Sequence, residues 1–126
     1  MNYDTAKIYL LNKPEAVEDY PFGPGVAVIK IGGKMFATLS HDPAAASMNL
    51  KCDPDEAMML RDIFVSVLPG YHMNKRHWNT VILDGQVPRG ELERMIDNSY
   101  SLVVKKLPRA QRQALEIRHG QGALYP

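Results

Sequence analysis

The sequence predicts an α+β fold, an antiparallel sheet with helices packed on one face. Two β-rich runs flank Gly32-Gly33, which is typical of a tight hairpin between antiparallel strands. The segment from Ser47 to Cys52 alternates polar and apolar residues, the period of a strand with one buried face. Apolar stripes at helical spacing follow in two later segments. The predicted order is therefore α-β-β-β-α-β-α.

The N-terminal third is predicted to hold one short helix and a hairpin. Asp4 can cap a helix that ends before Pro14, because the residue before a proline resists helical geometry. After a break rich in glycine and proline, strands over 26–31 and 34–40 flank the Gly-Gly pair. A loop over 41–46 then leads to the third strand.

The second predicted helix has the clearest start. Asp53 is placed as the N-cap, Pro54 at the first helical position, and Glu56 where it can reach back to complete a capping box. Pro69-Gly70 is expected to end this helix. Its apolar stripe consists of Ala57, Leu60, Phe64 and Val67.

The C-terminal half is predicted to hold one strand and one long helix. Residues 78–84 are rich in β-branched and aromatic residues and stop at a turn signal. Pro88 opens a helix that ends before Pro108. Its apolar stripe consists of Leu92, Met95, Ile96, Val103 and Leu107. Residues 109–119 are expected to form a further helical piece or a frayed tail.

Size and composition predict a single domain over residues 1–126. The chain is 45% hydrophobic and 23% charged, which is ordinary for a globular protein. It has no apolar run near the ~20 residues that span a bilayer, and no signal peptide is visible. Cys52 is the only cysteine and cannot form an intrachain disulfide, which suits a reducing compartment. We therefore expect a cytoplasmic protein without a membrane partner.

Charge is distributed unevenly although the formal net charge is only +1. Residues 1–63 carry 6 Lys and Arg against 9 Asp and Glu, whereas residues 64–126 carry 9 against 5. Lysine and arginine side chains neutralise the phosphates of nucleic acids. We therefore expect any anionic partner to meet the second half of the chain.

Residues 69–78 form the segment richest in candidate binding groups. They contain two cations, two histidines, an amide and two aromatic rings. Such groups contact phosphates and stack on bases or other planar ligands. In the alternative interpretation, Trp78 packs on the sheet while Lys75 and Arg76 are simply solvated. The candidate binding residues are His72, Asn74, Lys75, Arg76, His77, Trp78 and Lys51.

Five blocks of sequence, in order along the chain, resemble the MmcQ/YjbR family. They are PFGP at 21–24, GGKMFA at 32–37, NLKCDP at 49–54, GYHMNKRHW at 70–78 and DNSY at 97–100. The resemblance runs from about Pro14 to Pro108, so residues 109–126 form an extension outside the matched core. It implies a CyaY-like (frataxin-like) α+β sandwich and DNA binding through a "double wing" arrangement.

No metal site is expected. The resemblance to the frataxin fold implies iron binding by acidic residues on the first helix, but here that helix offers only Asp4. Glu15, Glu18 and Asp19 follow between prolines and form no helical ridge, whereas hard cations prefer several oxygen ligands held together. Cys52 has no histidine at a metal-ligand spacing, and its strand alternation favours a core position.

The sequence predicts a binding protein rather than an enzyme. Its glycine-rich segments match neither a phosphate loop nor a dinucleotide fingerprint, so no cofactor is expected. We expect a non-enzymatic domain whose basic-aromatic segment engages DNA or another anionic partner. The alternative is a protein-interaction or small-ligand module in which the same segment and Ser47, Asn49 and Lys51 form a recessed pocket for a compact anion.

Overall fold

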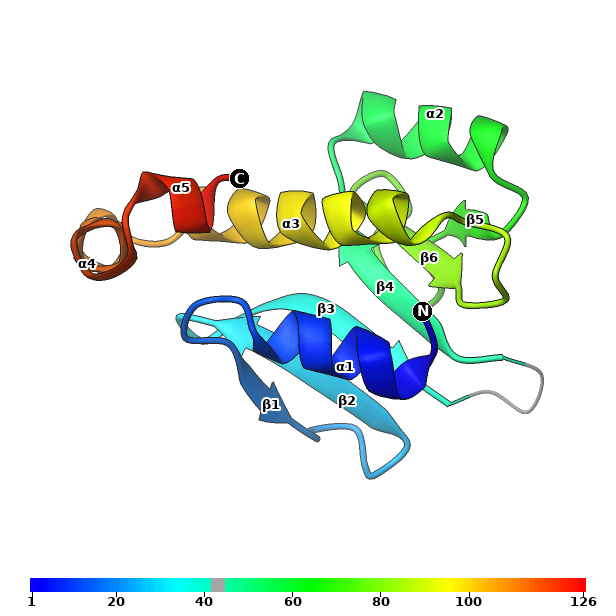
Figure 1. Ribbon diagram of the computed structural model, residues 1–126, viewed down its shortest axis with the longest axis horizontal. Helices are drawn as coiled ribbons and strands as arrows, with labels where there is room; N and C mark the ends of the chain where they lie inside the picture. Colours follow the sequence, from blue (N-terminus) through cyan, green and yellow to red (C-terminus); the bar gives the residue numbers. More distant parts are fainter. Residues whose placement is uncertain (42–44) are drawn as a thin grey trace.

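The computed structural model of this chain describes residues 1–41 and 45–126 (Figure 1). Its six-stranded sheet has the order β1-β2-β3-β4-β6-β5, with antiparallel neighbours throughout. The strands are β1 (Val17–Asp19), β2 (Val26–Ile31), β3 (Lys34–Ser40), β4 (Ser47–Lys51), β5 (Val67–Pro69) and β6 (Trp78–Ile82). The helices are α1 (Tyr3–Leu11), α2 (Pro54–Ile63), α3 (Arg89–Lys105), α4 (Arg109–His119) and α5 (Gln121–Leu124).

The core lies between one face of the sheet and the helices. Figure 1 shows α3 and α1 running across the sheet, while α2 lies beyond α3 at the end that holds β5 and β6. The ring of Phe36 on β3 meets the ring of Tyr100 on α3 edge to face, with 5.2 Å between centroids. The predicted α+β class with an antiparallel sheet and helices on one face is confirmed. Fully buried core members include Leu10, Ile29, Leu39, Met48, Val81 and Ile96.

The opposite face of the sheet is more polar. Strand register aligns Thr38, Asn49 and Thr80 as direct cross-strand neighbours, and Ser47 lies two residues before Asn49 on the same strand. Because side chains alternate along a strand, these four residues leave the sheet on the same side. We call Thr38, Ser47, Asn49 and Thr80 the polar face.

Helix α1 begins at a capping box that differs from the predicted cap. Asn2, rather than Asp4, is the N-cap: its Oδ1 accepts a hydrogen bond of 2.9 Å from the Thr5 N–H. The Thr5 hydroxyl in turn accepts from the Asn2 N–H at 2.9 Å. This reciprocal pair satisfies two backbone donors, so it defines the helix start better than one carboxylate. Asp4 lies inside the first turn, where its charge suits the helix dipole.

The predicted hairpin is present, and a further short strand precedes it. Gly32 and Gly33 between β2 and β3 have φ of +58° and +79°, as a two-residue turn with two left-handed positions requires. The unpredicted strand β1 pairs with β2. Its three residues are all exposed, so the strand carries no alternation of buried and exposed positions that sequence could reveal. Of the predicted loop over 41–46, residues 42–44 lie outside the described residues.

Helix α2 starts as predicted, but its capping box is incomplete. The Asp53 carboxylate accepts a hydrogen bond from the Glu56 N–H at 3.3 Å. The Glu56 carboxylate does not return to the Asp53 backbone and instead pairs with Arg94 of α3 at 2.6 Å. A fully charged partner on the facing helix binds the carboxylate more strongly than a neutral N–H.

The end of α2 was predicted too late in the sequence. The helix ends at Ile63, Phe64 is extended, and Val67 belongs to β5 rather than to a helical stripe. Val67 pairs with Val81 of β6 and is buried there. The β-branched Val65 and Val67 favour extended backbone, and pairing with β6 provides the hydrogen bonds that the helix would have supplied.

The long helix α3 has the predicted buried stripe, and residues 109–124 continue as α4 and α5. Leu92, Met95, Ile96 and Val103 are buried on α3, with Leu107 just beyond its end. Helix α4 is fixed to the rest of the chain by Leu115, which is buried, and by an ion pair of Arg118 with Glu15 at 2.7 Å.

Candidate functional site

The predicted binding segment forms a loop of residues 70–77 between β5 and β6, here called the basic loop. Its backbone hydrogen bonds are largely internal. The Gly70 N–H donates to the Trp78 carbonyl at 2.9 Å, the Met73 N–H to the Gly70 carbonyl at 3.2 Å, and the His77 N–H to the Asn74 carbonyl at 3.1 Å. Since these backbone groups are already paired, the loop is preorganised before any ligand arrives.

Two of the predicted binding side chains also brace this loop. The Lys75 ammonium donates to the Gly70 carbonyl at 2.9 Å, and the Asn74 amide oxygen accepts from the Arg76 N–H at 3.0 Å. The side chains of His72 and Arg76 are exposed to solvent. The loop therefore offers Arg76 as its freer cation, whereas the charge of Lys75 is partly used within the fold.

An aromatic pair stands at the start of the basic loop. Tyr71 is 68% exposed, and its ring lies 4.0 Å from the imidazole of His72. The backbone of Tyr71 is fixed to the polar face: its N–H donates to the Thr80 hydroxyl at 2.8 Å, and its carbonyl accepts from the Asn49 amide at 3.4 Å. The backbone that carries this exposed ring is thus fixed to the polar face.

His72 has left-handed backbone geometry, with φ of +58°. A residue with a Cβ pays on the order of 1–3 kcal/mol for an unfavourable backbone region, so the surrounding structure must impose it. The hydrogen bonds on both sides of His72 supply that constraint, at Tyr71 and at Met73. The loop therefore fixes the backbone from which this exposed imidazole projects.

The remaining predicted residues are His77, the last residue of the loop, and Trp78 and Lys51, which lie at the adjoining strand ends. Trp78 is only 9% exposed, so its ring packs into the fold and is not presented for stacking. His77 is half-buried, and its carbonyl accepts from the Cys52 N–H at 2.8 Å. Lys51 is the cross-strand partner of Trp78. Partial burial and the nearby Lys106 lower the pKa of Lys51.

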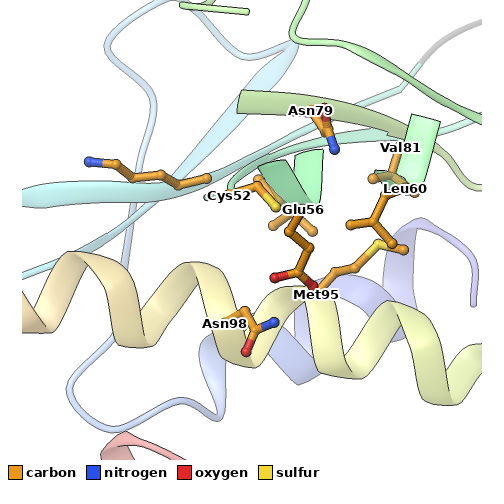
Figure 2. Close-up of a pocket in the computed structure, with 9 residues that line it drawn as sticks. Cys52, Glu56, Leu60, Asn79, Val81, Met95 and Asn98 are labelled. Atoms are coloured by element: carbon orange, nitrogen blue, oxygen red, sulfur yellow. The ribbon is translucent and has the colours of Figure 1, made fainter. Parts of the chain in front are cut away.

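A small cavity lies on the helical side of the sheet, between β4, α2 and α3 (Figure 2). Its volume is about 10 Å³, which is room for about one water molecule and not for a substrate. Figure 2 shows the Cys52 sulfur beside Glu56, with Met95 and Asn98 of α3 below. The lining residues are Leu50, Lys51, Cys52, Glu56, Leu60, Asn79, Val81, Met95 and Asn98.

The Cys52 thiol is buried, as its strand alternation predicted. Burial, followed by the negative charges of Glu56 and Asp53, raises the pKa of this thiol to about 11. At neutral pH the sulfur is therefore protonated and a poor nucleophile.

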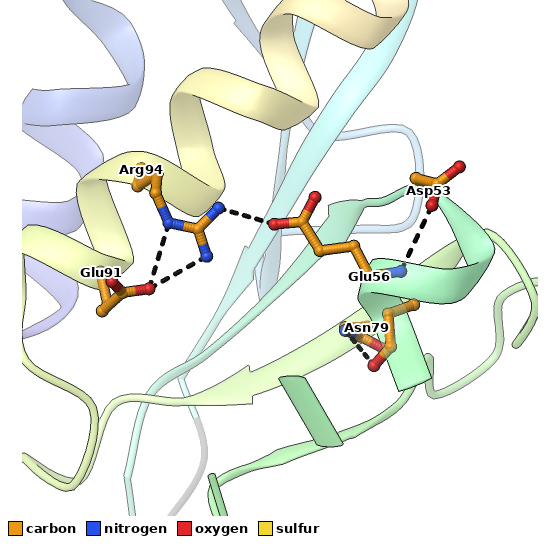
Figure 3. A network of polar contacts seen from close by, with 6 residues as sticks. Asp53, Glu56, Asn79, Glu91 and Arg94 are labelled. Carbon is orange, nitrogen blue, oxygen red and sulfur yellow. Dashed lines mark hydrogen bonds and ion pairs between the residues drawn. The ribbon is translucent and has the colours of Figure 1, made fainter. Parts of the chain in front are cut away.

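The sequence did not predict the open groove between α2 and the first turns of α3. Figure 3 shows Arg94 of α3 between two carboxylates, Glu91 on its own helix and Glu56 on α2. The groove has a volume of about 630 Å³. Its lining residues are Asp53, Asp55, Glu56, Met59, Leu60, Ile63, Phe64, Glu91 and Arg94.

Residues 1–41 and 45–126 contain neither a cluster of metal ligands nor a helix that could span a membrane. In these ranges, three or more His, Cys, Asp or Glu side chains nowhere gather into a group that could hold a metal ion. Likewise, each described helix is too short or too polar to cross a bilayer.

Two curated proteins of Escherichia coli are similar to this chain over most of its length. The uncharacterized protein YbdF of Escherichia coli O157:H7 is 38% identical over 118 residues, which cover 94% of this chain and 95% of YbdF. The uncharacterized protein YjbR of Escherichia coli strain K12 is 33% identical over 107 residues, or 85% of this chain and 91% of YjbR.

Solved structures show the same fold. The crystal structure of a Deinococcus radiodurans protein with a DUF419 domain has a TM-score of 0.84 at 35% identity, covering 90% of this chain and 87% of that one. A Pseudomonas syringae crystal structure has a TM-score of 0.74 at 30% identity, covering 81% and 98%. The YjbR family model matches residues 11–102. The resemblance drawn from the sequence blocks is thus confirmed, and the chain belongs to the YjbR family.

Proposed function

We propose that this YjbR-family chain is a non-enzymatic DNA-binding protein that uses the basic loop and the adjoining end of the polar face. The exposed Tyr71–His72 ring pair stands on the same preorganised loop as the exposed cation Arg76. A stacking surface and a phosphate-binding charge on one rigid element are what a nucleic-acid contact requires.

The electrostatics near this loop support an anionic ligand. Lys51 lies partly buried at the adjacent strand end, where Lys106 adds a second positive charge. A pKa lowered by burial and a like charge means that the protonated form of Lys51 lacks a compensating anion. A phosphate near Lys51 would stabilise that protonated form.

Binding accounts for these residues better than catalysis does. The raised pKa of the Cys52 thiol, and the water-sized cavity beside it, support a structural role for the sulfur. A lone protonated thiol also suits the reducing, cytoplasmic setting that we propose. A recessed pocket for a compact anion is less well supported, because the Tyr71 side chain next to the polar face is 68% exposed.

Titration of the purified protein against labelled single-stranded and duplex DNA tests this proposal. Between about 50 and 200 mM salt, affinity should fall with a log-log slope near −0.9 per phosphate neutralised, or a few units in total. Arg76→Ala should weaken binding and reduce the slope by about 1. The matched control is Arg109→Ala, which removes an exposed cation from the first turn of α4.

Two outcomes would contradict the proposal. An absence of binding at low salt would remove DNA as the ligand. An equal loss of affinity in the Arg109→Ala control would show that the protein attracts DNA through its overall charge and not through the basic loop.

A further inference from the structure

Helix α2 and its N-cap are acidic. Residues 53–63 hold the four carboxylates Asp53, Asp55, Glu56 and Asp62 against one cation, Arg61. The guanidinium of Arg61 turns inward, donating to the Asn79 amide oxygen at 2.7 Å and to the Lys75 carbonyl. Within the described part of the chain, Asp55 and Asp62 form no ion pair.

Apolar side chains are exposed on this same acidic helix. Met58, Met59 and Ile63 are each more than half exposed, and the apolar surface continues past the helix to Val65, which is 90% exposed. Several large apolar side chains gathered on one surface indicate a contact site. The unbranched, polarizable methionine side chain adapts its shape to different partners.

The groove between α2 and α3 gives this surface a defined shape. Its floor includes Leu60, which is buried, and Phe64, which is half-buried. Arg94 pairs with Glu56 on α2 at 2.6 Å and with Glu91 on α3 at 3.0 Å, so one guanidinium links the two walls (Figure 3). Because both walls belong to helices of the fold, the groove is present without a ligand.

We propose that the α2–α3 groove docks a cationic amphipathic helix from a partner protein. The carboxylates along α2 favour Lys and Arg on such a helix, while the apolar floor accepts side chains spaced at i, i+3, i+4 and i+7. The ten residues of α2 span about 15 Å, enough to contact two to three turns of a docked helix. This site goes beyond the proposed DNA contact, since an acidic groove repels phosphates.

The docking proposal can be tested with a synthetic helix of Leu and Lys residues arranged with one apolar and one cationic face. The readout is the NMR signal of methionine methyl groups in the full chain. The signals of Met59, which lines the groove, and of the exposed Met58 next to it in the sequence should shift on titration. Those of Met48 and Met95, which are buried in the core, should not. A peptide with Glu in place of Lys, and a scrambled peptide of the same composition, should bind at least tenfold more weakly.

A matched pair of variants tests whether the peptide contacts α2. Ile63→Ser removes an exposed apolar side chain from α2 and should weaken peptide binding about tenfold. Ile117→Ser removes a side chain that is 85% exposed on α4 and should leave the affinity unchanged. Both variants should keep the thermal stability of the original chain, because exposed positions contribute little to it.

Three results would overturn the docking proposal. Equal binding of the scrambled or acidic peptide would show that binding does not depend on an amphipathic arrangement or on positive charge. Equal weakening of peptide binding by Ile117→Ser would show that the peptide does not bind specifically at α2. Shifts of Met58 and Met59 with protein concentration, in the absence of peptide, would assign the groove to a second copy of this chain. None of these results bears on DNA binding, which is measured at a different surface.

Discussion

The basic loop and the α2–α3 groove differ in nearly every physical property. The loop is polar, braced by its own hydrogen bonds and marked by the exposed cation Arg76. The groove has an apolar floor, four carboxylates and a guanidinium that is already paired. A formal net charge of +1 therefore conceals two surfaces of opposite character. The arrangement of charge, and not its sum, decides which partners a small domain can bind.

Among residues at the loop, replacement of Trp78 should lower the free energy of unfolding the most. Its side chain is only 9% exposed, so replacement by alanine would leave the space of the buried indole ring empty. Trp78→Ala should lower the free energy of unfolding by about 3–5 kcal/mol, as measured by urea denaturation. DNA affinity should fall with it, whereas peptide binding at the groove should persist in the folded fraction. A cost below about 1 kcal/mol would mean that the ring is presented to solvent after all.

Replacement of Arg61 should have the next largest effect on the free energy of unfolding, because Arg61 links α2 to the basic loop. From α2 its guanidinium reaches Asn79 on β6 and the Lys75 carbonyl in the basic loop. Arg61→Ala would leave the buried Asn79 amide oxygen without this donor and should cost about 1–3 kcal/mol in urea denaturation.

The control for this change is Arg89→Ala on α3. Arg89 is exposed and pairs with Glu93 one turn along the same helix. Its loss should cost under about 0.5 kcal/mol. Equal costs for the two variants would show that Arg61 does not hold the loop to α2.

Ionisation of the Cys52 thiol should have the smallest effect on stability, and none of it should be seen at neutral pH. Its raised pKa means that the folded state favours the neutral thiol, so this contribution to stability is complete below the ordinary thiol pKa and is lost as pH rises toward about 11. Labelling by a thiol reagent should be slow at pH 7 and accelerate toward pH 11. The urea-unfolded chain, as the control, should already label quickly near pH 9. Fast labelling of the folded protein at neutral pH would reopen the case for a reactive cysteine.

Strong local signals in the sequence predicted most of the fold. The Gly32-Gly33 turn, the alternation before Cys52 and the cap at Asp53 each depend on neighbouring residues, and each appears in the structure. Strands β1 and β5 were missed because each has three residues and gains its stability from pairing with β2 or β6. Such pairing is set by residues distant in sequence, which local patterns do not report.

The candidate site could be predicted only where its residues are contiguous. Residues 70–77 were recognisable because they adjoin one another in the sequence. The groove draws on α2 and α3, whose facing residues lie more than 30 positions apart, as Glu56 and Arg94 do. A signal was nevertheless present: Met58, Met59 and Ile63 lie off the predicted buried stripe, so α2 is apolar on more sides than a surface helix requires.

Both edges of the sheet end in strands of three residues. Strand β1 carries the charged Glu18 and Asp19, and β5 closes with Pro69, which has no N–H to offer. Short, charged or proline-containing edges resist the edge-to-edge pairing that leads to fibrils. Concentrated solutions of this chain should therefore resist β-aggregation despite its exposed apolar side chains.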